Sequence, residues 1–267
     1  MAKHVPIRDI PNYLLERGQH SATTAELQRL TGGNVHAVAV GMARLRKGGR
    51  MFTPAKGLHV VIAPEYRRCG APPALDFIHP MMLVLKRQYY VALLSAADLH
   101  GAAHQRAQVL QVMVNRHVPD RQFGRARFRF FVARHVTQVG VVMKNSDTGT
   151  VQVSNPEVTA LDLASRPLDC GGVSNVATVI AELADGVGLD TSRLAVEARR
   201  YPIATLRRLG WLLEFVDAKV DLGQLEKRVN AQPAMRATTL LDPSGARQGK
   251  SSRRWQVVEN VTVEPDL

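Results

Sequence analysis

The feature that most constrains the fold of this chain is the alternation of helical patterns with glycine pairs in its first 64 residues. Thr23-Thr24-Ala25-Glu26 has the form of a capping box and predicts a helix that ends at Gly32-Gly33. From Asn34 to Lys47, apolar residues recur at helical spacing, and Gly48-Gly49 ends this second pattern. A shorter helical pattern over 10–14 precedes both. The predicted order is therefore helix, helix, turn, helix.

The helix predicted over 34–47 has two unlike faces. Its apolar face repeats at i, i+3, i+7 and i+10 and comprises Val35, Val38, Met42 and Leu45. The opposite, basic face comprises His36, Val40, Arg44 and Lys47. Two short strands are expected next, over 51–53 and 58–62, joined by a turn that contains Lys56.

The charge of the chain is concentrated in the same region. The 267 residues carry 35 Lys+Arg and 23 Asp+Glu, for a net charge of +12, and residues 1–64 hold nine of the basic residues against three acidic ones. Such an excess favours a polyanionic partner, most simply nucleic acid. A helix with one buried face and one basic face, followed by a two-stranded wing, is what docking into a major groove requires. The pattern predicts a winged helix-turn-helix domain over residues 1–66.

The partner on this interpretation is double-stranded DNA, and the predicted DNA-binding residues fall into two groups. Asn34 and His36, near the start of the 34–47 helix, are expected to reach base edges. The residues expected to contact phosphates or enter a minor groove are Arg44, Lys47, Arg50 and Lys56. The alternative is a three-helix protein-interaction domain with a solvated basic face.

A segment rich in proline, with Gly70, separates this region from the rest and breaks both helix and strand. We therefore predict a second domain over 74–267. It opens with a helix expected over 83–99. Strand patterns follow at 109–114, 125–132, 139–143 and 151–153, and helical patterns follow at 156–165, 173–185, 191–200, 203–216 and 221–229. One more strand is expected at 255–263, so the fold class is α+β.

Three arginines alternate along the predicted 125–132 strand. The spacing of Arg125, Arg127 and Arg129 places their guanidinium groups on one face. This face is a candidate second anion-binding or partner surface of the chain. The alternative is an edge strand that uses charge to prevent aggregation.

Catalytic and metal-binding motifs are weak in this sequence. His100 and His104 stand at i and i+4 but lack the glutamate of a metalloprotease helix and a clear third ligand. Asp217-Ala218-Lys219 resembles part of a nuclease carboxylate–lysine set without a partner strand. The sequence contains neither a nucleophile elbow nor a phosphate-binding glycine loop. We therefore expect no enzymatic activity, no catalytic residues, no metal and no cofactor.

Cysteine usage and hydropathy bear on the compartment. Cys69 and Cys170 lie too far apart in sequence for a disulfide scaffold or a metal knuckle. No stretch approaches the ~18 apolar residues of a membrane span, and the amino terminus lacks an apolar signal core. These features predict a cytoplasmic protein without a membrane partner.

Several segments together resemble one family. In the first domain they are Leu45–Arg50 and Lys56–Val60, where His59 occupies a position at which tyrosine is commoner. In the second they are Tyr90–Gly101, which contains Ser-Ala-Ala-Asp-Leu-His-Gly, Val153–Leu163, which contains Asn-Pro-Glu-Val-Thr-Ala-Leu-Asp-Leu, and the tail from Trp255. The chain resembles the AbiEi-type antitoxins of type IV toxin–antitoxin, or abortive infection, systems.

This resemblance implies a bacterial phage-defence protein with two activities. The winged helix is expected to bind the promoter of its own operon, at inverted repeats, and to repress transcription. The larger α+β antitoxin domain is expected to neutralise a cognate nucleotidyltransferase toxin without forming a stable complex. Two other classes stay open: a winged-helix regulator whose carboxy-terminal domain senses a ligand, and a nuclease or nucleotidyltransferase.

Overall fold

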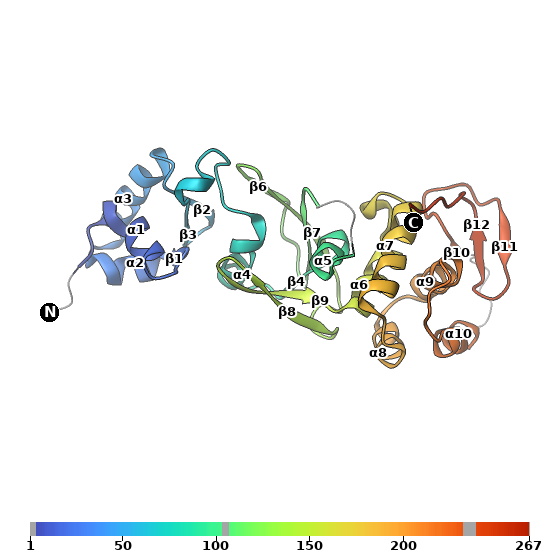
Figure 1. The fold of residues 1–267 in the computed structure, drawn as a ribbon. Helices are drawn as coiled ribbons and strands as arrows, with labels where there is room; N and C mark the ends of the chain where they lie inside the picture. The colour runs from blue at the N-terminus through green and yellow to red at the C-terminus, as the bar shows by residue number, and fades with distance from the viewer. Residues whose placement is uncertain (1–3, 103–106, 232–238, 267) are drawn as a thin grey trace. The chain divides into compact units, whose positions relative to one another are not determined.

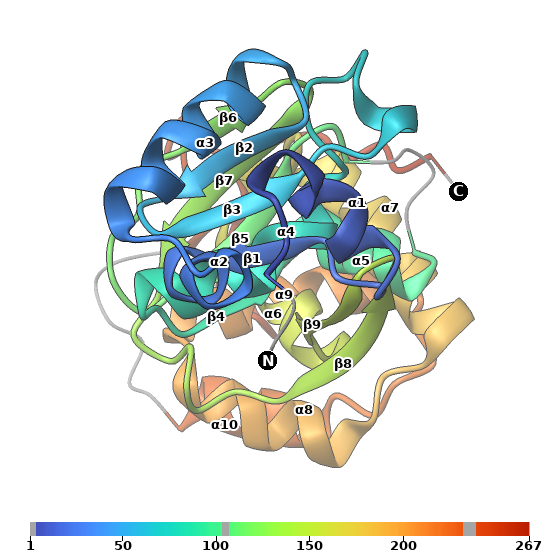
Figure 2. The same cartoon turned by 90° about the vertical axis from the view of Figure 1, so that its left-hand side faces the viewer.

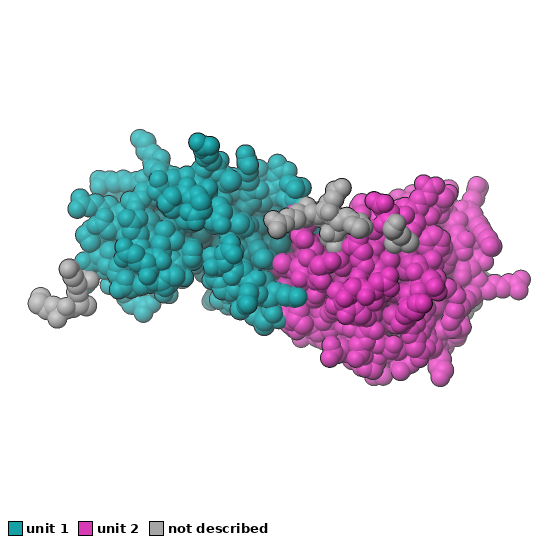
Figure 3. Space-filling view, in the orientation of Figure 1, with its two compact units in different colours: residues 1–89, 108–134, 143–152 teal, residues 90–107, 135–142, 153–267 magenta. Residues whose placement is uncertain are grey.

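The structure, a computed structural model, describes residues 4–102, 107–231 and 239–266. The chain forms two compact units, coloured separately in Figure 3. Unit 1 comprises residues 1–89, 108–134 and 143–152, and unit 2 comprises residues 90–107, 135–142 and 153–267. Helices and strands occur in both units, so the predicted α+β class is confirmed. Among the described helices, none combines the length and hydropathy that a transmembrane span requires.

The amino-terminal part of unit 1, blue in Figure 1, contains three helices and a small antiparallel sheet. The helices are α1 (Ile10–Leu15), α2 (Thr24–Thr31) and α3 (Val35–Lys47), and a 3-10 turn, η1 (Ile7–Asp9), precedes them. The strands are β1 (Ser21–Thr23), β2 (Met51–Ala55) and β3 (Leu58–Val61), in the order β1-β3-β2. The predicted capping box is present, with Thr23 and Glu26 satisfying each other's backbone N–H groups.

One hydrophobic core holds these elements together. Its larger buried side chains are Ile10, Leu14, Leu27, Val38, Met42, Leu45, Met51 and Val61. The prediction that Val35 belongs to this core is wrong. Val35 is the first residue of α3 and is 60% exposed. Gly41 is buried on the core side of α3, where the Ile7 side chain packs so closely that a Cβ would clash with it. In Figure 2, α3 runs beside β2, against which it packs.

The remainder of unit 1 is built on α4 (Ala74–Leu85) and three strands, β5 (Leu110–Val114), β6 (Arg121–Phe123) and β7 (Ala126–Val132). β7 lies between the other two, antiparallel to β6 and parallel to β5. The helix predicted over 83–99 is wrong. Lys86 adopts a left-handed conformation that ends α4, and β4 (Tyr89–Val91) and α5 (Leu93–His100) follow.

A cluster of phenylalanine rings joins distant segments of unit 1. The Phe77 ring of α4 lies 5.2 Å from that of Phe52 in β2 and 5.1 Å from that of Phe128 in β7. Phe123 of β6 completes the cluster, 5.5 Å from Phe52. These contacts join residues on both sides of the boundary predicted between residues 66 and 74. The compact units also have bounds other than those of the predicted domains 1–66 and 74–267.

Unit 2 is mainly helical. After α5 it contains α6 (Pro156–Ser165), α7 (Val173–Glu182), α8 (Thr191–Glu197), α9 (Ile203–Phe215) and α10 (Gly223–Asn230). Its tail, red in Figure 1, forms β10 (Thr239–Leu240), β11 (Lys250–Ser252) and β12 (Val257–Glu259), in the order β10-β12-β11. Trp255 is fully buried against Gly210 of α9, where a Cβ would overlap the indole ring.

Two further strands, β8 (Val141–Ser146) and β9 (Gly149–Ser154), are adjacent in sequence and in the sheet, and each contributes residues to both units. β9 pairs in parallel with β4 through Val153 and Val91. The final residues of β9 lead directly into α6, whose N-cap is Asn155. Only Asp147 and Thr148 separate β8 from β9, so the two strands form a hairpin with a tight turn.

Candidate nucleic-acid interface

The predicted base-reading residues, Asn34 and His36, lie at the start of α3 and differ in their hydrogen bonding and exposure. Asn34 is the N-cap of the helix, and its Oδ1 accepts a hydrogen bond of 2.9 Å from the Ala37 backbone N–H. The amide oxygen of Asn34 is therefore committed to the helix end, which leaves its Nδ2 group free to donate. His36, two residues after the cap in the first turn of α3, is exposed.

Three of the predicted phosphate-contacting residues are exposed cations. Arg44 and Lys47 lie in the last turn of α3, and Lys56 lies in the turn between β2 and β3, beside Gly57 with its φ of 90°. Within the described part of the chain, none of the three pairs with an acidic side chain. Their charges therefore face solvent on the helix and on the wing-like turn.

Arg50, the fourth, has a structural role that the sequence did not indicate. Its guanidinium donates to the Arg8 carbonyl oxygen at 2.7 Å and to the Asn12 Oδ1 at 3.0 Å. It thereby ties the segment before β2 to η1 and α1. Arg46, which is not among the predicted DNA-binding residues, is also exposed on α3, with its Nη1 3.4 Å from the Thr53 Oγ1.

His59, at the position where the resembled family commonly has tyrosine, is buried in the small sheet. Its Nε2 lies 3.0 Å from the Thr24 Oγ1 and its Nδ1 lies 3.1 Å from the Thr53 Oγ1. Burial, and secondarily the charge of Arg46, lower the pKa of His59. A neutral imidazole is therefore favoured as a link between the start of α2 and the wing-like hairpin.

The arginine face of β7 alternates as predicted. Arg127 and Arg129 are exposed while Phe128 is buried, and Arg125 is exposed just before the strand begins. The Arg129 guanidinium also lies 5.2 Å from the centre of the Phe131 ring. β7 has a neighbour on each side, so the edge-strand explanation for these arginines does not apply.

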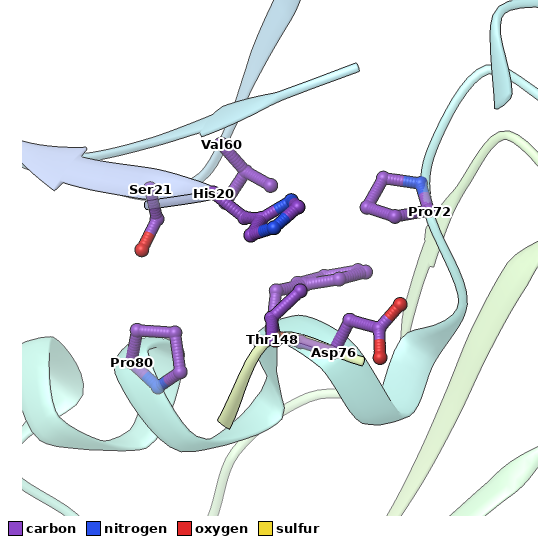
Figure 4. Close-up of a pocket in the computed structure, with 8 residues that line it drawn as sticks. His20, Ser21, Val60, Pro72, Asp76, Pro80 and Thr148 are labelled. Carbon is purple, nitrogen blue, oxygen red and sulfur yellow. The ribbon is translucent and has the colours of Figure 1, made fainter. Parts of the chain in front are cut away.

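A small pocket in unit 1, shown in Figure 4, has a volume of about 50 Å³ and is lined by His20, Ser21, Val60, Pro72, Asp76, Phe77, Pro80 and Thr148. The Asp76 side chain is 8% exposed, and its Oδ2 lacks a hydrogen-bond partner among the described residues. Burial, with a contribution from Asp147, raises the pKa of Asp76 to about 6. The space suffices for a few water molecules rather than an organic ligand.

Unit 2 contains a buried polar network centred on Asp162 of α6. This fully buried carboxylate accepts hydrogen bonds from the Tyr90 hydroxyl at 3.1 Å and from the Tyr201 hydroxyl at 2.8 Å. The His135 Nε2 lies 3.8 Å from the same carboxylate. Burial, followed by the negative charge of Asp162, raises the pKa of both tyrosines, so they stay protonated donors.

Neighbouring residues of the same sequence segments are also hydrogen-bonded internally. Asn155 caps α6 through the Val158 N–H, and the Ser154 and Thr159 hydroxyls lie 2.7 Å apart. The His100 Nε2 lies 2.7 Å from the Ser154 carbonyl oxygen. His104, the other histidine of the predicted pair, lies outside the described residues. The motif residues of this region therefore form the packed interior of unit 2.

The groups considered for catalysis are dispersed. Asp217 has a φ of 51° at the end of α9, as part of a turn. Over the described ranges, no three His, Cys, Asp or Glu side chains come together as metal ligands.

Comparisons with known proteins identify one matching family and one similar solved structure. Residues 90–215 match the family described as the AbiEi antitoxin C-terminal domain. No curated protein matches the sequence. The structure is similar to the crystal structure of the RV2827C protein from Mycobacterium tuberculosis, with a TM-score of 0.69 and 14% identity over 96% of this chain and 93% of that one. That similarity shows a shared fold, whereas the family match identifies residues 90–215 as similar to the AbiEi antitoxin C-terminal domain.

Proposed function

We propose that this chain is an AbiEi-type antitoxin that binds double-stranded DNA through its amino-terminal elements and represses its own operon. The family supplies the antitoxin role in a toxin–antitoxin system. The observation that carries DNA binding is the exposed face of α3, where Arg44 and Lys47 have no acidic partner in the described ranges, together with Lys56 on the adjoining hairpin. A polyanion complements such a face.

The order and packing of the elements support a winged helix-turn-helix. α2 ends at Gly32, whose φ of 64° turns the chain toward α3, and the hairpin of β2 and β3 follows. α3 buries one stripe of side chains in the core and leaves the opposite stripe in solvent. In a helix-turn-helix the second helix lies in the major groove and uses its exposed stripe.

Promoter binding tests this proposal. The full chain should bind its own promoter, and log K should fall against log salt with a slope of roughly −4 if about four phosphates are neutralised, at ~0.9 per phosphate. Arg44→Ala, Lys47→Ala and Lys56→Ala should each weaken binding to all sequences and flatten the slope by about 1. Arg193→Ala, which removes an exposed arginine of α8 in unit 2, is the matched control and should change neither quantity. Unchanged affinity and slope in all three variants would exclude this face.

We further propose that the chain neutralises a cognate nucleotidyltransferase toxin without a stable complex, and that the arginine face of β7 contributes. That face presents its charges on a strand held from both sides, which limits their motion. Charge reversal at Arg125, Arg127 and Arg129 should reduce rescue of growth when the toxin is co-expressed, with promoter repression intact. Reversal at Arg193, Arg199 and Arg253 gives the same charge change elsewhere and should leave rescue intact. Full rescue by the first triple variant would rule out the β7 face.

The proposal also includes a cytoplasmic, phage-defence role without catalysis by the chain itself. The dispersal of titratable groups supports it, because a hydrolytic or transfer site needs a nucleophile, base or metal set brought together. Purified protein should neither cleave nucleic acid nor transfer nucleotides with Mg²⁺ or Mn²⁺ present. Metal-dependent cleavage that co-purifies with the chain and is abolished by one of its own substitutions would reverse this conclusion.

A further inference from the structure

The centre of the solvent face of α3 is unusually apolar for a face flanked by charge. Residues at i, i+3, i+4, i+7 and i+11 form a single stripe along a helix. On α3 this stripe is His36, Ala39, Val40, Ala43 and Lys47, and each of them is exposed. Between the imidazole at one end and the ammonium at the other, the stripe offers only methyl groups.

These exposed apolar side chains are not part of the core. Val40 is 39% exposed, whereas the core side of the same helix buries Val38 and Met42 almost completely. The longer polar side chains lie beside the stripe. By helical periodicity, Arg44 falls on one flank of the stripe and Arg46 on the other. Arg46 is further held toward Thr53 of β2.

The apolar side chains of this stripe complement the apolar group of the major groove, the C5 methyl of thymine. The base edges there present hydrogen-bond donors and acceptors, and only thymine adds a methyl group, at its C5 position. Alanine and valine side chains offer no hydrogen bond to guanine, cytosine or adenine, but they pack against a thymine methyl. The flanking cations suit the phosphates on either side of the groove.

We propose that the middle of α3 recognises thymine methyl groups in the major groove, with Val40 and Ala43 as the residues in contact. This inference rests on the proposed DNA binding and names the feature that the same helix reads. It predicts sites with thymines at the positions opposite the middle of α3, bordered by positions that His36 reads.

Replacement of thymine by deoxyuridine isolates this contact, because it removes the C5 methyl and keeps Watson–Crick pairing. A random duplex pool is enriched on the full chain, and the enriched site is resynthesised with deoxyuridine at one thymine at a time. Each methyl that contacts α3 should lower the affinity by roughly threefold to fivefold when removed, as for the loss of one buried methyl group. Thymines elsewhere in the site should tolerate the replacement.

A variant of the helix assigns the effect to α3 rather than to altered DNA flexibility. Val40→Ser removes two methyl groups at an exposed position and keeps a similar helix propensity. In this variant the thymine-to-deoxyuridine ratio should fall toward one at the position that Val40 contacts, while the salt slope stays unchanged. Val196→Ser, the same change at an exposed valine of α8 in unit 2, should keep the full ratio.

The possible outcomes test methyl recognition by α3 and DNA binding itself separately. Enrichment of a site that binds equally well with deoxyuridine at every thymine would overturn the methyl-reading proposal and leave DNA binding intact. The same holds if Val40→Ser keeps the full thymine-to-deoxyuridine ratio at every position. Failure to enrich any sequence, with equal weak binding to all duplexes, would overturn both the methyl reading and the proposed promoter recognition.

Discussion

The amino-terminal elements of unit 1 and the buried network of unit 2 use polar side chains in opposite ways. On α3, Arg44 and Lys47 extend into solvent, and neither pairs with an acidic side chain among the residues that the structure describes. In unit 2, Asp162 is fully buried and receives two tyrosine hydroxyls. The segments that resemble the AbiEi family most specifically belong to the second kind. The residues of the family-specific motifs therefore stabilise the interior of unit 2. The proposed binding residues belong instead to a pattern shared by many DNA-binding helices.

The two arrangements also differ in what a substitution removes. Truncating an exposed cation removes charge and leaves the fold nearly unchanged, with effects on the unfolding free energy within about 0.5 kcal/mol. Truncating a buried acceptor leaves donors unsatisfied, and each such group costs about 1–3 kcal/mol. The following changes test that division.

Asp162→Ala should have the largest effect on stability. Loss of the carboxylate leaves the Tyr90 and Tyr201 hydroxyls without their acceptor, so the free energy of unfolding should fall by about 3 kcal/mol. Urea denaturation followed by circular dichroism measures the change. Tyr201→Phe removes one donor and should have about a third of the effect. If Asp162→Ala unfolds at the same urea concentration as the parent, the network does not stabilise unit 2.

Arg50→Ala tests a residue whose predicted role and observed contacts differ. Because its guanidinium donates to the Arg8 carbonyl and to Asn12, the variant should lose about 2 kcal/mol of unfolding free energy. The salt slope of promoter binding should stay at the parental value if the contacts are structural. A slope flattened by about 1, with the unfolding free energy preserved, would instead assign Arg50 to the DNA phosphates.

Asp76→Asn should reveal a titration in unit 1. The pKa of Asp76 is raised to about 6, above its unfolded value of about 4, so the folded state holds the proton more tightly. This carboxyl therefore contributes stability below pH 4 that is lost as the pH rises through 6. At pH 7 the variant should be more stable than the parent by about 1–2 kcal/mol. Thermal unfolding well below pH 4, where this carboxyl is protonated in both the folded and the unfolded parent, serves as the internal control and should not show the difference seen at pH 7.

Asn34→Ala should have the smallest effect on stability, about 1 kcal/mol, because it removes the cap of α3. Asn34→Ser restores a capping oxygen without the amide, so it should regain stability. Comparison of the two variants separates capping from base reading. Should Asn34→Ser keep parental stability and lose sequence preference in promoter binding, the Asn34 amide contacts a base.

Local signals in the sequence predicted the elements that local interactions determine. The capping box at Thr23 and the apolar stripe of 34–47 gave α2 and α3 nearly to the residue. The prediction over 83–99 failed because the apolar periodicity continues through Lys86, where a left-handed backbone conformation ends α4. β1 has only three residues and depends on pairing with β3, which lies 35 residues further along, so no local pattern marks it.

The candidate site shows the same division. Exposure of Arg44, Lys47 and Lys56 follows from helix periodicity and turn position, and the sequence predicted these residues as a surface group. The role of Arg50 depends on Arg8, 42 residues away, and the unpaired carboxylate oxygen of Asp76 depends on packing from several segments. Contacts of this range are set by the tertiary structure, so periodicity carries no information about them.

The phenylalanine cluster has a consequence for recombination between genes. Phe52, Phe77, Phe123 and Phe128 come from three separate stretches of coding sequence around one core, and unit 1 as a whole is assembled from discontinuous pieces. A single crossover within codons 66–74 would bring Phe52 from one parent together with partner rings from another. A chimaera of that kind keeps the α3 surface of one parent but combines aromatic side chains from two, so exchange of the α3 codons alone should disturb the interior of unit 1 less.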